Sequence, residues 1–248
     1  MYQSIEDKCS SIESFNKLYY IIKEEMRKNK KLKILAISAH PDDMEFEAGG
    51  TLGKWALKGH EIYHLVLTAG EYRDLNEKIH KTEKLRKEAQ NAAKVLSIKE
   101  LIFFDYTTTE LPCSGKLVSE VDKIVQDVCP DIIISHHPFD SHQDHRAAAE
   151  IVFAVSRQGR VKNVLSSAPF PYRPNVFAFR PQFFVDISST IDIKLEAIRC
   201  YKSQFEKFGN EKLTDRIQSW ARVWGWAVEL EFAECFEVIR MSDVFDIF

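Results

Sequence analysis

The sequence between residues 32 and 156 alternates short, almost wholly apolar runs with longer amphipathic stretches, and this alternation restricts the fold more than any other feature. Strands that are apolar at nearly every position belong to parallel sheets covered by helices on both faces. We therefore predict strands at 32–37, 61–68, 101–104 and 131–135, and helices at 45–58, 81–96, 117–128 and 144–156. Because crossovers between parallel strands are right-handed, we expect a Rossmann-like, doubly wound α/β sheet with strand order 3-2-1-4.

The rest of the chain is less regular, and its 248 residues suit one large domain. Residues 1–30 are expected to form a helical arm ahead of a single domain at 31–248. In the second half, we expect a long Pro-rich loop at 169–181, strand-like runs at 175–179 and 182–187, helices at 190–207 and 213–228, and an edge strand at 233–239.

Composition and charge exclude several classes of protein. The chain has 34 Lys and Arg against 37 Asp and Glu, so it lacks the basic field that would attract nucleic acid. We expect no membrane span, because no apolar run approaches about 18 residues. Acidic residues from Glu6 onward argue against a signal peptide, so the expected location is the cytoplasm. The five scattered cysteines indicate neither disulfides nor a thiolate zinc site, and homo-oligomer formation is left open.

Two polar clusters follow the first and fourth predicted strands. The first is the run from Ala39 to Glu45, and the second is the run from His136 to His145, which holds four of the eight histidines. In doubly wound sheets, ligands bind beyond the carboxyl ends of the strands where the strand order reverses. The predicted order makes these two strands neighbours, so both clusters should face one crevice.

The residue types in these clusters suit a catalytic metal. Imidazole and carboxylate ligands without cysteine are typical of catalytic zinc, although a set of two His and one carboxylate also suits Fe(II). A spare carboxylate can serve as a general base, and a spare histidine can protonate a leaving group or stabilise an oxyanion. The alternative is that an Asp here only caps the next helix and a His lies on the surface. Two clusters at one end of adjacent strands favour the metal site.

These clusters also carry a family resemblance. The run Ala39-His40-Pro41-Asp42-Asp43-Met44-Glu45, followed by Gly49-Gly50-Thr51, resembles the AHPDDxE…GGT signature of the PIG-L/LmbE-like family of zinc-dependent N-deacetylases. The run His142-Gln143-Asp144-His145 matches the second motif of that family, H-x-D-H. Weaker similarities lie at 68–71, 85–89, 186–204 and 225–236, so the resemblance extends over about residues 33–240.

The resemblance implies a role for each matched residue. Zinc would be held by His40, Asp43 and His145. Asp42 would be the general base that activates water, His142 the electrophilic or acid partner, and Asp144 the residue that orients His142. The reaction implied is hydrolysis of an N-acetyl group on an amino sugar or on its glycoside, lipid or nucleotide conjugate.

The substrate side of the site is less constrained. We expect Glu71, Arg73 and His136 to contact substrate, with Arg73 binding a sugar hydroxyl or a phosphate unless it is simply a surface residue. Thr108 stands where many relatives carry an Asp, which leaves the sugar contacts of that region and the exact substrate open. The competing hypotheses are a deacylase of a non-sugar amide or a longer acyl chain, a non-catalytic metal- or ligand-binding protein, and a non-haem iron enzyme. Gly49 and Gly50 are expected to permit close packing rather than to bind phosphate.

Overall fold

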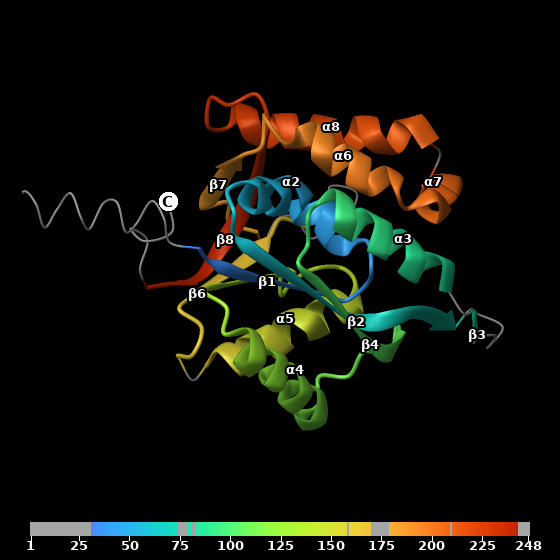
Figure 1. Ribbon diagram of the computed structural model, residues 1–248, viewed down its shortest axis with the longest axis vertical. Helices are drawn as coiled ribbons and strands as arrows, with labels where there is room; N and C mark the ends of the chain where they lie inside the picture. The colour runs from blue at the N-terminus through green and yellow to red at the C-terminus, as the bar shows by residue number, and fades with distance from the viewer. Residues whose placement is uncertain are drawn as a thin grey trace, which may run out of the picture. The chain divides into compact units, whose positions relative to one another are not determined.

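A computed structural model describes residues 31–73, 79–80, 83–157, 159–169, 179–208 and 210–242 (Figure 1). The predicted helical arm at 1–30 lies outside the described residues, as does most of the predicted loop and strand-like run between 170 and 178. Residues 32–242 form one compact unit, which is the part of the chain considered below.

The described residues form an eight-stranded, mostly parallel sheet. Its strands are β1 (Lys33–Ser38), β2 (Glu61–Arg73), β3 (Ile79–His80), β4 (Glu100–Thr108), β5 (Ile132–Ser135), β6 (Asn163–Ser167), β7 (Phe183–Asp186) and β8 (Ala233–Met241). The order is β3-β2-β1-β5-β6-β8-β7, with β4 also paired to β2. The four predicted strands thus lie in the order β4-β2-β1-β5, all parallel, which confirms the predicted Rossmann-like arrangement.

Helices cover both faces of the sheet (Figure 1). One face carries α2 (Asp43–Leu57), α3 (Glu83–Val95), α6 (Ile191–Arg199), α7 (Lys202–Phe208) and α8 (Asn210–Trp226). The other face carries α4 (Gly115–Val128) and α5 (Gln143–Ser156). The strands between them are apolar because both of their faces are covered: all four residues of β5 are buried.

Two expectations for the second half are corrected by the structure. The single helix expected at 190–207 is broken at Cys200 and Tyr201 into α6 and α7. Glu88 on α3 accepts hydrogen bonds from the backbone N–H and the hydroxyl of Ser203, which satisfies an otherwise unpaired donor at the start of α7.

The last apolar run is not an edge strand, because β8 lies inside the sheet, between β6 and β7, and is antiparallel to both. Its first five residues are buried, as expected for a strand with neighbours on both sides. An apolar run alone does not indicate which strands it pairs with, and β6 was not predicted.

Helix α2 packs closely on the segment that follows β7. A Cβ added to Gly50 would lie 2.8–2.9 Å from three atoms of Ile187. The prediction that these glycines serve close packing is therefore confirmed at Gly50. At the end of the helix, Gly59 has a φ of +87°, a conformation that glycine adopts without steric cost. None of the described helices is long and apolar enough to cross a membrane.

Candidate metal centre

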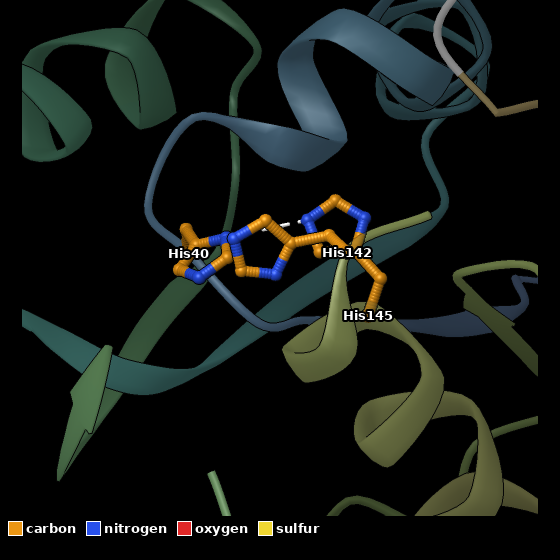
Figure 2. Close-up of side chains that lie close together, drawn as sticks. All are labelled: His40, His142 and His145. Carbon is orange, nitrogen blue, oxygen red and sulfur yellow. Dashed lines mark hydrogen bonds between the residues drawn. The ribbon is translucent and has the colours of Figure 1, made fainter. Parts of the chain in front are cut away.

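The two predicted polar clusters come together at the carboxyl ends of β1 and β5. His40 and Asp42 lie in the turn between β1 and α2, and Asp43 begins that helix. His142 caps the start of α5, and His145 lies in its first turn. Because β1 and β5 are neighbouring parallel strands, both turns lie at one end of the sheet. Figure 2 shows the imidazoles of His40, His142 and His145 gathered there, with the contact between His40 and His145 dashed.

Three side chains lie as close to one another as the ligands of a tetrahedral ion, and each of the two Asp43 oxygens faces one histidine. His40 Nδ1 lies 3.2 Å from Asp43 Oδ2, and His145 Nε2 lies 3.2 Å from Asp43 Oδ1. The two imidazole nitrogens are 3.3 Å apart. Ligand atoms placed about 2.0–2.1 Å from a tetrahedral zinc ion are roughly 3.3–3.4 Å from one another. The donor set and its spacing therefore fit zinc, and the two-His, one-carboxylate set also fits Fe(II).

The outer nitrogen of each of these two histidines faces a carboxylate. His40 Nε2 is 3.1 Å from Asp144 Oδ2, and His145 Nδ1 is 3.3 Å from Asp140 Oδ2. A proton on the outer nitrogen leaves the lone pair of the inner nitrogen available, which is how ligand histidines are commonly oriented. Asp140 was missed in the sequence, although it lies within the second cluster and is fully buried.

Asp144 acts on His142 in a different way from the one expected. Its carboxylate is directed to His40 and accepts hydrogen bonds from the backbone N–H groups of Thr109 and Leu111, at 2.6 and 3.3 Å. Only its backbone N–H reaches His142, donating to Nδ1 at 3.2 Å. Thr109 adopts a φ of 74°, which is strained for a β-branched residue and directs its N–H toward this carboxylate.

His142 is held as a hydrogen-bond donor. Because its Nδ1 accepts the N–H of Asp144, the proton of the neutral ring lies on Nε2. Burial, together with the neighbouring imidazoles of His40 and His145, lowers the pKa of His142 to about 4. The ring is therefore neutral near pH 7, and its Nε2–H can donate to an oxygen that gains negative charge.

Asp42 is poised as a base. It occupies the capping position of α2, but its side chain makes no capping hydrogen bond, so helix capping does not account for it. Burial and the adjacent charge of Asp43 raise the pKa of Asp42 to about 6, close to the range that suits a general base at neutral pH. Burial also opposes ionisation of Asp43, but His145 and His40 outweigh it and hold the pKa of Asp43 well below its usual value.

Metal binding at His40 would displace a proton. Burial lowers the pKa of His40, but Asp43 and Asp144 more than compensate and raise it to about 9. An imidazole must be unprotonated to coordinate a metal ion, so binding at His40 is coupled to proton release near neutral pH.

The three residues predicted to bind substrate have different outcomes. The side chains of Glu71 and Arg73 lie outside the described residues. His136 is buried and enclosed by protein rather than open to a substrate. Its Nδ1 is 3.1 Å from Glu47 Oε2, and its Nε2 accepts the N–H of Ala39 at 3.0 Å. His136 lies within metal-binding distance of Asp43 and His145, but both of its nitrogens already have protein partners.

A Rossmann-like sheet with a His- and Asp-lined centre at the ends of β1 and β5 is the arrangement expected of a metal-dependent hydrolase. Residues 35–156 match the family model described as "PIG-L: GlcNAc-PI de-N-acetylase". The chain is 30% identical over 187 residues to diacetylchitobiose deacetylase from Thermococcus kodakarensis, covering 70% of each protein. It is also 26% identical over 189 residues to 4-oxalmesaconate hydratase from Pseudomonas putida, covering 68% of this chain and 73% of that protein.

The fold has a close counterpart of known structure. The N,N'-diacetylchitobiose deacetylase from Pyrococcus horikoshii superimposes with a TM-score of 0.72 over 92% of each chain, at 24% identity. The chain belongs to the PIG-L family, as the two sequence motifs predicted.

Proposed function

We propose that this chain is a metal-dependent hydrolase that removes the N-acetyl group of an amino sugar or of its conjugate. The observation that carries the proposal is the triangle of His40, Asp43 and His145, at 3.2–3.3 Å, with a base and a hydrogen-bond donor beside it. Zinc is the proposed metal, and Fe²⁺ is the alternative. When bound, the ion supplies Lewis acidity at the acyl carbonyl and lowers the pKa of the attacking water.

Asp42 and His142 supply the proton chemistry. The Asp42 carboxylate takes a proton from water as the water oxygen bonds to the amide carbon. The Nε2–H of His142 donates to the carbonyl oxygen, which becomes negative as the tetrahedral centre forms. The C–N bond then breaks, and the proton held by Asp42 passes to the leaving nitrogen, giving acetate and a free amine.

The outer carboxylates keep these groups in place. Asp144 holds His40, Asp140 holds His145, and the N–H of Asp144 holds His142. Each contact selects one tautomer of its histidine. The nitrogen on the opposite side of each ring is thereby prepared to bind metal, in His40 and His145, or to donate a hydrogen bond, in His142. Partners of this kind typically change metal affinity by about 10- to 100-fold.

The relatives support the choice of substrate class. The first of them is named for diacetylchitobiose, a substrate built from N-acetylated amino sugars. Another relative is named as a hydratase, which is a different reaction. A direct test of the substrate therefore follows. The rival hypotheses remain a deacylase of a non-sugar amide or a longer acyl chain, and a protein that only binds metal.

The test is acetate release from N-acetylhexosamine substrates, offered as free sugar, glycoside and nucleotide conjugate, with metal content measured in parallel. Asp42→Asn should abolish acetate release while keeping about one zinc per chain, because Asp42 is a base and not a ligand. His145→Ala should lose the metal. Zinc without acetate from any substrate would overturn the amino-sugar assignment, and full zinc content in His145→Ala would overturn the ligand assignment.

A further inference from the structure

Glu47 is a buried carboxylate that takes no part in the proposed reaction. It lies one turn after Asp43 on α2, on the same face of the helix, and its side chain is 3% exposed. Burying a carboxylate is costly unless it is paired and hydrogen-bonded. Its position behind the metal centre therefore needs an explanation.

The contacts of Glu47 tie it to His136. His136 Nδ1 is 3.1 and 3.2 Å from the two carboxylate oxygens, and the hydroxyl of Ser167 donates to Oε2. A carboxylate oxygen accepts the hydrogen bond in this contact, so the Nδ1 of His136 carries the proton. Glu47 thereby sets both the rotation of this ring and the position of its proton.

The opposite edge of His136 touches the proposed metal ligands. Its Nε2 accepts the N–H of Ala39, the residue before His40, at 3.0 Å. The same nitrogen lies 3.2 Å from Asp43 Oδ2, and the ring stacks on His145 at 3.8 Å between centroids. One imidazole therefore lies against Asp43, His145 and the backbone that leads to His40.

We propose that Glu47 is a positioning residue that fixes the metal ligands through His136. With the ring held by Glu47, its Nε2 accepts the N–H of Ala39 and so fixes the backbone that leads to His40, while its face packs against His145. The inference rests on the proposed function, because it takes His40, Asp43 and His145 as the ligands. It assigns Glu47 no contact with metal or substrate.

The test is the zinc affinity of the purified chain, measured by competition with a chromogenic chelator. Glu47→Ala should weaken zinc binding by about tenfold or more, the size of effect seen when a partner of a ligand is removed. Glu47→Gln should recover most of the affinity, because its amide oxygen can still accept the Nδ1–H of His136. If Glu47 acts through His136, the double variant Glu47→Ala/His136→Ala should bind zinc no more weakly than His136→Ala alone.

Glu237 offers a matched control. It is an equally buried carboxylate, 3.2 Å from Nε2 of the next histidine in the chain, His137, but it also pairs with Arg180. Glu237→Ala should therefore keep wild-type zinc affinity even if it lowers the melting temperature. A general loss of packing would instead lower the zinc affinity of both variants.

Three results would overturn the proposal. The first is wild-type zinc affinity in Glu47→Ala, and the second is an additive loss in the double variant. The third is a second zinc per wild-type chain that Glu47→Ala removes, which would make Glu47 a ligand in a group with Asp140 and His145. The proposed function is checked separately by His145→Ala: if that variant keeps its zinc, the ligand set is wrong, whatever Glu47 does.

Discussion

Two adjacent glycines on α2 should respond to the same substitution in opposite ways. An alanine at position 50 would place its Cβ 2.8–2.9 Å from Cδ1, Cβ and Cγ2 of Ile187. One of these atoms is bonded directly to the backbone, so rotating the Ile187 side chain cannot relieve the contact. At position 49 the nearest atom is Cγ of Lys194 at 3.4 Å, which is ordinary van der Waals contact.

The expected magnitudes follow from two opposing effects. Replacing glycine by alanine inside a helix stabilises it by roughly 0.8–1 kcal/mol. Forcing extra volume into a packed core costs about 1–3 kcal/mol. Gly49→Ala should therefore be neutral or stabilising by up to about 1 kcal/mol, whereas Gly50→Ala should destabilise by up to about 2 kcal/mol.

The assay is urea unfolding of both variants with a metal chelator present, so that differences in metal binding do not contribute. The midpoints should shift in opposite directions, or at position 49 remain unchanged, with similar dependence on urea concentration. If Gly50→Ala proves as stable as Gly49→Ala, the packing of α2 against Ile187 is not what requires glycine at position 50.

Other side chains give three more predictions. Asp144→Asn should weaken zinc binding by about 10- to 100-fold in the chelator competition, because it removes the charged partner of a ligand histidine, whereas the surface variant Asp122→Asn should not. Burial lowers the pKa of His64 to about 4. The stability that the neutral His64 side chain contributes is therefore complete above the pKa of about 6.5 that the residue has in the unfolded chain, and it is lost as the pH falls toward 4. In His64→Gln, the loss of unfolding free energy between pH 7.5 and 5 should therefore be smaller by about 2 kcal/mol, and an unchanged loss would contradict the assignment. Lys194→Met leaves the Glu234 carboxylate buried without its charged partner and should cost about 3–5 kcal/mol in urea unfolding, part of which Lys194→Met/Glu234→Gln should restore. A double variant no more stable than the single one would argue against this pairing.

The sheet and the location of the site could be predicted from the sequence for one physical reason. Strands covered on both faces must be apolar throughout, so β1, β2, β4 and β5 are visible as apolar runs. Right-handed crossovers then leave few possible orders, and the clusters after β1 and β5 must meet. The position of β8 lacked such a rule, because its partners β6 and β7 are antiparallel to it and separated from it by long stretches of chain.

Contacts within the site were harder to predict, because they depend on which atom of a side chain faces which neighbour. The H-x-D-H motif indicates that Asp144 lies near both histidines, but not that its carboxylate turns to His40 while its backbone serves His142. Asp140 was missed for the same reason. Its contact with His145 depends on the residue at which α5 begins, which the sequence does not specify. Glu47 had a usable signal: a residue four positions after Asp43 in a helix lies on the same face.

The irregular features of the chain concentrate where the proposed chemistry is. Thr109 has a left-handed backbone conformation that a β-branched residue ordinarily avoids, and its N–H holds the carboxylate that orients His40. Asp42 stands at a helix start without capping the helix, and Glu47 is buried in a place where an apolar side chain would cost less. Each of these features lowers stability locally, and each is directed at the same few side chains. A fold selected only for stability would not retain all three there, so their convergence independently supports a functional centre at the ends of β1 and β5.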